Sequence, residues 1–441
     1  MPLKRKTNKT GAADIFEYTF ANGVTLIAEP IEAVRTAAIG FWFSCGSRRE
    51  KKAYSGVTHF AEHMLFKGTK TRSAFDIASA FDRMGGYANA FTEREQVCLY
   101  CVVPADRAED ALDILCDMAE NSVFPAAEIE RERTVIESEI AAASDDPEEA
   151  AFDAVARILW PNDPLSLPIA GTVSGIKKID ADFLRSWYTD FFQNGELTVC
   201  VSGNIRLHSF CARLEKAGRH LKNPRAENDF RKDSLPPRHL KSKPSRVHFL
   251  NADFQQEQFF VLYPLMVPCS LRHFYCRAVL NALIGDTMSS RLFQALRERS
   301  GYCYTVYSFF SVYTDCGYWC AYVCAPKKNA AKIVAAIRAE LALLVQSGFT
   351  FDEVSAAKEH VCGEEIINAE DTEHRMKRLA RSRFSGFEQT DFDRSIEAIR
   401  NLSDAELTEE LRRLLNPDCE TMIIYGPELS ESVRKRIEKT L

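Results

Sequence analysis

The stretch SGVTHFAEHMLFKGT, residues 55–69, carries two histidines and a glutamate in the order H-x-x-E-H. It predicts a helix, and Ser55 is of a residue type that caps helix starts. His59 and His63 are four residues apart, so both imidazoles would lie on one face of that helix. Together they could bind one metal ion, and Glu62, on the same side, could take a proton from a water molecule. A surface helix that carries these three residues by chance would have the same pattern.

A second predicted helix, EIERERTVIESEIAAA at residues 128–143, could supply a further ligand. Ala, Glu, Arg and Ile dominate it, and neither Gly nor Pro interrupts it. Glu132 and Glu139 are seven residues apart, which places them about two turns apart on one face. A catalytic zinc site usually has three protein ligands and one open position, so two histidines alone would be incomplete. Acids on helices are also commonly solvated, and the helical pattern alone is compatible with either role.

The pentad and the ERTVIESE run of the second helix together resemble the pitrilysin/insulinase family of zinc peptidases, which are inverzincins. In that family the third ligand is a glutamate at about this distance, and a glutamate seven residues earlier supports the site. The resemblance implies that His59, His63 and Glu139 bind one Zn²⁺ per chain. Glu132 would be the supporting acid. Glu62 would be the general base of a zinc metalloendopeptidase that cleaves peptides or extended segments of proteins.

Composition predicts a soluble globular protein of several domains. The chain has 441 residues, more than one ordinary core needs, so two to four domains are expected. Hydrophobic residues make up 46%, charged residues 27%, and the net charge is −6, which argues against nucleic acid or an anionic membrane as a partner. No apolar run approaches the roughly 20 residues of a membrane helix. The basic start of the chain lacks the apolar segment of a secretory signal.

Cysteine usage favours a reducing compartment. Cys98 and Cys101 are spaced C-x-x-C, but they fall in the apolar, strand-like run VCLYCVVP, and no second C-x-x-C follows at zinc-finger spacing. Most of the 14 cysteines are therefore expected to be reduced thiols in the core. This usage predicts a cytoplasmic protein.

The first half of the chain is predicted to contain both strands and helices. A hairpin is expected at residues 15–29, where alternating apolar residues flank Asn22-Gly23, a strong turn signal. Further strands are predicted at 36–45, 87–103 and 197–204. Further helices are predicted at 74–84, 105–121, 126–143, 147–159 and 180–192.

Asn89 and Ala90 are the candidate substrate-binding residues. They match the part of a family strand that borders the cleft and pairs with extended substrate. The physical basis is that an open strand edge can template another chain, and small or amide side chains leave room for it. An ordinary sheet strand would account for the same two residues.

An internal repeat predicts the domain organisation. Residues 220–246 are rich in Pro, Lys and Arg and poor in apolar residues, as expected of a linker. VVPADRAEDALDIL before the linker resembles VCAPKKNAAKIVAAI after it, and VFPAAEIERE likewise resembles GFTFDEVSAA. We expect two similar α+β domains, a zinc-binding one over residues 1–219 and a second one over residues 247–441 that lacks the pentad. The family resemblance implies that the two halves face each other like a clamshell.

The segment LRERSGYCYTV of the second half resembles the family's Arg-Tyr segment. In the family the tyrosine hydroxyl donates to a developing oxyanion and the arginine holds substrate backbone. The resemblance assigns these roles to Arg297 and Tyr304, which are seven residues apart, and Tyr302 is the alternative tyrosine. A core aromatic residue and a surface arginine would be the ordinary interpretation.

Three functional classes are compatible with these patterns: a zinc endopeptidase, a non-catalytic binding or assembly subunit with the same fold, and a protein with a structural zinc site. The intact pentad together with Glu139 favours the endopeptidase. Its expected partners are peptides or unfolded proteins as substrates. Family members of this length often pair, so a homodimer or pairing with a related chain is also expected.

Overall fold

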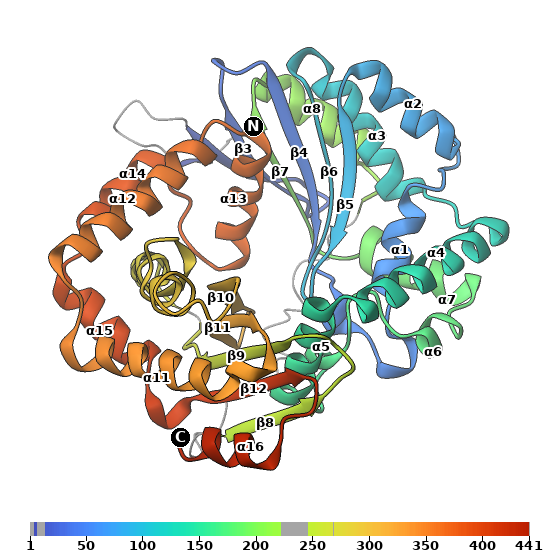
Figure 1. Cartoon of the computed structure of the whole chain (residues 1–441). Coiled ribbons are helices and arrows are strands. Elements are labelled where there is room, and N and C mark those ends of the chain that lie inside the picture. Colours follow the sequence, from blue (N-terminus) through green and yellow to red (C-terminus); the bar gives the residue numbers. More distant parts are fainter. Residues whose placement is uncertain (1–3, 7–13, 222–245, 268, 441) are drawn as a thin grey trace. The chain divides into compact units, whose positions relative to one another are not determined.

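The computed structural model describes residues 4–6, 14–221, 246–267 and 269–440 (Figure 1). It divides into two compact units. The first unit comprises Met1–Asp229 and Asn368–Asp391, and the second comprises Phe230–Ile367 and Phe392–Leu441. The linker predicted at residues 220–246 lies almost entirely outside the described residues.

The first unit is built on a mixed sheet that has seven strands within the described residues, in the order β1-β2-β3-β7-β4-β6-β5. Neighbouring strands are antiparallel except β3 and β7, which are parallel. The predicted hairpin around Asn22-Gly23 is confirmed as β2 and β3, and Gly23 takes a φ of 88° there. The strands are β1 (Lys4–Lys6), β2 (Ile15–Thr19), β3 (Thr25–Pro30), β4 (Thr36–Phe43), β5 (Tyr87–Thr92), β6 (Val97–Pro104) and β7 (Leu197–Gly203).

The prediction of a single long strand at residues 87–103 is wrong, because the chain reverses direction about halfway along this segment. β5 and β6 form an antiparallel hairpin, closed by the Glu93 N–H, which donates to the Gln96 carbonyl at 2.7 Å. The four polar residues EREQ at 93–96 interrupt the apolar pattern where the turn falls. The turn places β5 at the edge of the sheet, with one side free of any strand among the described residues.

Helices cover one face of this sheet and enclose the main core of the first unit. The helices predicted in this half are all present. α2 begins with a capping box between Ser73 and Asp76 and ends at Gly85, whose φ is 72°. The helices are α1 (Val57–Leu65), α2 (Ala74–Met84), α3 (Ala108–Asn121), α4 (Ala126–Asp145), α5 (Pro147–Leu159), α6 (Val173–Ile176), α7 (Ala181–Tyr188) and α8 (Leu207–Ala217).

The opposite face of the sheet is covered by α13 (Thr372–Phe384), which comes from far along the chain (Figure 1). Met376 and Leu379 are buried with Trp42 in one apolar cluster between this helix and the sheet. Gly40 permits the close approach, because a Cβ at that position would meet Met376 Sδ at 2.4 Å. The central strands of the sheet are therefore covered on both faces.

The position of α13 corrects the expected domain limits. Residues 368–391 were expected in the C-terminal domain, and they belong to the first unit. A buried ion pair helps to hold them there: Arg375 Nη1 on α13 lies 2.7 Å from Glu29 Oε1 on β3. The Glu29 side chain is only 1% exposed, and it also accepts a hydrogen bond from Ser202.

We expect Arg375→Met to lower the free energy of unfolding by roughly 3–5 kcal/mol, because it leaves a buried carboxylate without its cation. The matched control is Arg383→Met on the same helix. Arg383 is 41% exposed and lies 3.9 Å from Glu17 and 4.0 Å from Glu196, so the loss of these exposed pairs should cost at most about 1 kcal/mol. Urea unfolding of the three proteins measures both effects. Equal effects of the two substitutions would contradict the docking of α13 through this pair.

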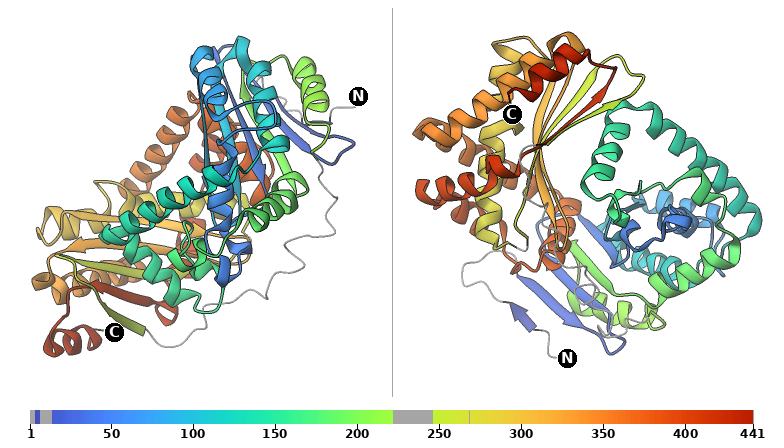
Figure 2. Two further views of the ribbon diagram at one scale, coloured as in Figure 1. Left: turned by 90° about the vertical axis from the view of Figure 1, so that its right-hand side faces the viewer. Right: turned by 90° about the horizontal axis from the view of Figure 1, so that it is seen from below.

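The second unit repeats the plan of the first. Among the described residues its sheet has five strands, in the order β10-β11-β9-β12-β8, with β12 and β8 parallel and the other pairs antiparallel. In Figure 2 this sheet is drawn as yellow, orange and red arrows. The first sheet contains the same arrangement as β5-β6-β4-β7-β3, with its parallel pair in the same place. The predicted internal repeat and the fold class, two similar α+β domains that each combine a mixed sheet with helices, are therefore confirmed. The strands are β8 (Arg246–Asn251), β9 (Glu257–Pro264), β10 (Thr305–Val312), β11 (Gly317–Ala325) and β12 (Thr421–Gly426).

The helices of the second unit enclose a second apolar core. Within the described part of the chain, no single helix is long and apolar enough to cross a membrane. The segments Lys327–Ser347 and Phe351–Asn368 reach that length and apolar composition only when taken together, and the chain bends by 107° between them. The helices are α9 (Leu271–Asn281), α10 (Arg291–Phe293), α11 (Ala330–Ser347), α12 (Phe351–Asn368), α14 (Phe392–Arg400), α15 (Asp404–Leu414) and α16 (Glu431–Glu438).

Candidate metal centre

Helix α1 presents the pentad, and its start is held by a residue outside the helix. The predicted cap, Ser55, is wrong: the helix begins after Gly56, which has a φ of 99°. Glu50 in the preceding loop accepts the first amides instead, from Gly56 N–H at 2.6 Å and from Thr58 N–H at 2.9 Å. A carboxylate at this end also interacts favourably with the helix dipole. Glu50 is 2% exposed, so the start of α1 is anchored in the protein interior.

His59, His63 and Glu139 converge between α1 and α4, which lie side by side (Figure 1). The two histidine Nε2 atoms are 3.2 Å apart, and Glu139 Oε2 lies 3.6 Å from His63 Nε2 and 3.9 Å from His59 Nε2. Donor atoms about 2.0–2.2 Å from one tetrahedral zinc ion lie roughly 3.3–3.6 Å from each other. The donor set fits one such ion after a small movement of Glu139, whose side chain is 45% exposed. No other group of this kind occurs among the described residues.

Glu132 orients the ring of His63 through the ring nitrogen that does not face Glu139. The Nδ1 of His63 lies 3.0 Å from Glu132 Oε2, and Lys67 Nζ lies 2.6 Å from Glu132 Oε1. Burial alone would raise the pKa of Glu132, but the hydrogen bonds from Lys67 and His63 outweigh it and lower that pKa. The ionised carboxylate accepts a hydrogen bond from Nδ1–H, which leaves the Nε2 lone pair available to a metal. Lys67 is not among the residues predicted from the sequence. It lies just beyond the end of α1 at Leu65, and its place four residues after His63 is the signal that could have pointed to it.

Burial adjusts the protonation of the pentad. It lowers the pKa of His59 to about 4, with His63 adding to the effect, so His59 is neutral at neutral pH and able to bind a metal. Burial raises the pKa of Glu62, which is 8% exposed. The hydroxyl of Thr92 donates to Glu62 Oε2 at 2.7 Å and opposes that rise. A buried carboxylate whose pKa lies nearer to neutral is a better proton acceptor.

Asn89 and Ala90 lie on β5, the edge strand next to α1. Asn89 is exposed, and Ala90 packs against the main core. The Asn89 Oδ1 accepts the Ala90 N–H at 2.9 Å. The structure therefore brings both residues to a sheet edge beside the helix of the pentad.

Arg297 and Tyr304 lie in the second unit and contact each other. The Arg297 Cζ is 4.4 Å from the centroid of the Tyr304 ring, and Tyr304 is 78% exposed. Tyr302, the alternative tyrosine, packs against the second core, and its carbonyl accepts a hydrogen bond from Asn329 at 2.9 Å. Of the two tyrosines, Tyr304 is the more exposed, because Tyr302 is partly buried.

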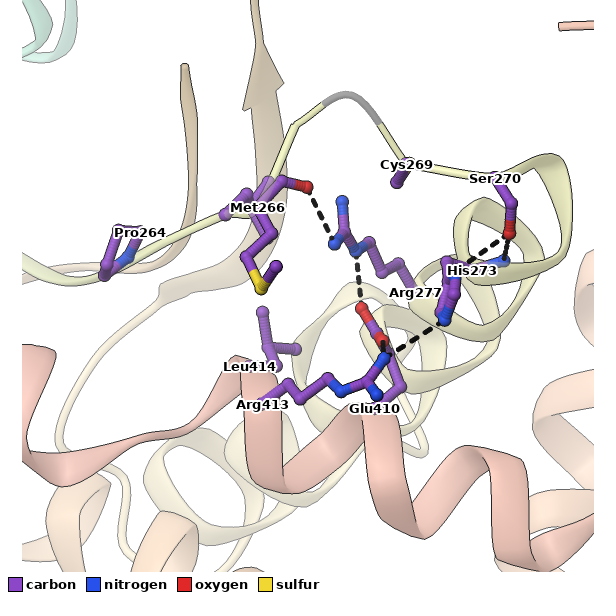
Figure 3. A pocket seen from close by; sticks show the side chains of 10 residues that line it. Pro264, Met266, Cys269, Ser270, His273, Arg277, Glu410, Arg413 and Leu414 are labelled. Atoms are coloured by element: carbon purple, nitrogen blue, oxygen red, sulfur yellow. Dashed lines mark hydrogen bonds and ion pairs between the residues drawn. The ribbon is translucent and has the colours of Figure 1, made fainter. Parts of the chain in front are cut away.

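A pocket in the second unit is lined in part by polar and charged side chains (Figure 3). Arg277 and Glu410 form a buried ion pair at 2.7 Å. His273 lies between Arg413, 3.1 Å from its Nε2, and Ser270, whose Oγ is 2.7 Å from its Nδ1. Arginine can only donate, so His273 Nε2 accepts and its Nδ1 donates to Ser270. The Ser270 Oγ also accepts the His273 backbone N–H at 3.3 Å, so it caps the start of α9.

Comparison with known proteins identifies the family. Residues 26–173 match the family model described as Insulinase (Peptidase family M16), and residues 178–361 match the one described as Peptidase M16 inactive domain. A protein of Streptomyces coelicolor named an uncharacterized zinc protease is 32% identical over 412 residues, which are 92% of this chain and 88% of that protein. One of Bacillus subtilis with the same description is 34% identical over 365 residues, 82% of this chain and 87% of that protein. The chain belongs to the insulinase family of peptidases, family M16, as the sequence predicted.

Solved structures share the fold. A structure described as the peptidase M16 inactive domain from Pseudomonas fluorescens superposes with a TM-score of 0.85 at 16% identity, covering 94% of this chain and 99% of that one. A protease from Helicobacter pylori gives a TM-score of 0.83 at 18% identity, covering 94% and 100%. These likenesses support the two-unit fold.

Proposed function

We propose that this chain is a zinc-dependent endopeptidase that cleaves peptides or extended segments of proteins. The observation that carries the proposal is the convergence of His59, His63 and Glu139, whose donor atoms lie within 4.8 Å of one another, next to the buried Glu62. Membership of a peptidase family supports peptide hydrolysis as the reaction. The relatives named zinc proteases support zinc as the metal, one ion per chain.

The proposed mechanism divides the work among the residues of the first unit. A zinc ion bound by the three ligands would act as a Lewis acid towards water and the substrate carbonyl. Glu62 takes a proton from the attacking water and returns it to the leaving amine. Glu132, itself held by Lys67, keeps the ring of His63 oriented. Three protein ligands with an adjacent carboxylate suit an open catalytic site better than a closed structural one.

The substrate is proposed to bind as an extended strand at the edge of β5, beside Asn89 and Ala90. The outer edge of β5 has no partner strand among the described residues, which supports this mode, because its backbone groups can hydrogen-bond a further strand. Arg297 is proposed to hold substrate backbone and Tyr304 to donate to the developing oxyanion. The exposure of Tyr304 and its stacking with Arg297 support a role in binding over one in core packing.

The proposed setting is a reducing compartment such as the cytoplasm, where the protein acts as a homodimer or pairs with a related chain. All 14 cysteines are described, no disulfide joins any of them, and most are buried, which supports a reducing environment. Neither nucleic acid nor a membrane is proposed as a partner.

We expect His63→Ala and Glu139→Gln to lose the zinc. Their affinity for zinc should fall by more than the roughly 10–100-fold that is typical when a residue hydrogen-bonded to a metal ligand is replaced. Glu130→Gln is the matched control, because Glu130 lies on α4 but is 69% exposed and pairs with Arg133. Metal analysis and chelator competition measure the zinc, and mass-spectrometric mapping of cut sites measures hydrolysis. A full equivalent of zinc in either ligand variant would contradict the ligand set, and no cleavage of any peptide by the zinc-loaded parent would contradict the proposed function.

A further inference from the structure

Thr92 connects the edge strand to the carboxylate of the pentad. It is the last residue of β5, and its hydroxyl donates to Glu62 Oε2 at 2.7 Å. Within the described residues this is the only hydrogen bond made by the Glu62 carboxylate, which is 8% exposed. Among the described residues, that hydroxyl is therefore the one hydrogen-bond donor that orients the carboxylate.

The geometry of β5 explains why Thr92 reaches α1. Side chains alternate along a strand, so Thr92 shares a face with Ala88 and Ala90. Both alanines pack against the main core, which includes the apolar side of α1. Thr92 continues that row at the end of the strand, where Glu62 lies within reach of its hydroxyl.

The other face of β5 is held by α13. The Tyr87 hydroxyl donates to Glu373 at 2.6 Å, and Lys377 Nζ lies 5.2 Å from the centroid of the Phe91 ring. β5 is therefore packed on both faces, while its outer edge has no partner strand among the described residues. Because these contacts hold the strand in place, Thr92 can hold the Glu62 side chain in one position.

We propose that Thr92 is a positioning residue for Glu62. This inference rests on the proposed peptidase function. The hydroxyl holds Oε2, so that Oε1 is the oxygen left to accept the proton of the attacking water. Because Thr92 lies two residues after Ala90, the strand proposed to bind substrate also sets the position of the general base. The register of the substrate and the position of the general base would then both be set by β5.

The test compares Thr92→Val with the parent as full-length, zinc-loaded proteins. Valine keeps the shape and strand preference of threonine and removes the donor. We expect kcat to fall by about 10–100-fold, the range for one hydrogen bond to a charged group. KM should stay within about twofold and the zinc content should be unchanged, since backbone and ligands are retained. Thr92→Ser should restore most of kcat.

A matched control is Thr198→Val on β7 of the same sheet. Thr198 is 1% exposed, and its hydroxyl has no hydrogen-bond partner in the described part of the chain, so kcat should be unchanged. Crystal structures of the zinc-loaded proteins give a readout independent of turnover. The Glu62 carboxylate should keep one position in the parent and in Thr92→Ser and leave it in Thr92→Val.

The inference is overturned if Thr92→Val turns over at the parent rate. It is overturned as well if kcat falls while Glu62 stays in place, or if serine fails to restore activity. An inactive parent would instead count against the proposed function, and the inference would fall with it. Only the combination of displaced Glu62, reduced kcat, normal zinc and rescue by serine supports the positioning role.

Discussion

Glu62→Gln is expected to retain zinc and to lower kcat for peptide hydrolysis by about 10²–10⁴-fold, the usual contribution of a general base. The amide is nearly isosteric with the carboxylate, and it still accepts the hydrogen bond from Thr92 through its carbonyl oxygen. It has no basic site at neutral pH, so it cannot take a proton from water. The ligand atoms lie on other residues, so the metal site should be intact.

The measurement is single-substrate kinetics at matched zinc content. Glu130→Gln on α4 controls for the loss of one negative charge near the site, and its kcat should equal that of the parent. Parent-like turnover by Glu62→Gln would remove this residue from the mechanism. Loss of zinc from the same variant would instead make Glu62 a ligand, contrary to the geometry.

Residues 1–219 alone are expected not to fold into a zinc-binding protein. This fragment corresponds to the N-terminal domain expected from the sequence, but it lacks α13, which covers the central strands of the first sheet on one face. Trp42 would be exposed together with its apolar neighbours on that face. Each large apolar side chain returned to water costs about 1.5–3 kcal/mol, and a typical domain has only about 5–15 kcal/mol of stability in total. The losses therefore exceed what the fragment can tolerate.

The experiment adds the missing segment back. A chain of residues 1–219 joined through a flexible linker to residues 366–392 should unfold cooperatively and bind one zinc, and the short fragment should do neither. The matched control carries Met376→Asp and Leu379→Asp in the added segment, which removes its apolar contacts at unchanged length. Near-ultraviolet circular dichroism, dye binding and zinc analysis distinguish the three proteins. Cooperative unfolding of residues 1–219 at the parent temperature would show that α13 is dispensable.

Several features of this protein were predictable from sequence because short-range patterns encode them. His59 and His63 lie on one helical face whatever surrounds them, since the helix repeat alone brings residues four apart together. The Asn22-Gly23 turn is equally local, because glycine adopts the positive φ that the turn requires. The repeat of similar segments likewise implied two similar sheets, and the strand orders agree. The fold class and the two histidine ligands follow from these patterns, while the family and the third ligand, Glu139, came from the resemblance of the pentad and the ERTVIESE run to known zinc peptidases.

Other features depended on contacts between residues far apart in the chain, which no local pattern records. Glu50 caps α1 across a loop, and Thr92 meets Glu62 only because β5 turns back into β6 beside that helix. The amphipathic pattern of α13 fits any apolar surface, and nothing in it specifies the first sheet. Only the tertiary structure decides that partner, through the close approach at Gly40 and the buried pairing of Arg375 with Glu29. Hydrophobic burial is non-directional, so the pattern predicts that a face is covered, while shape and charge complementarity determine what covers it.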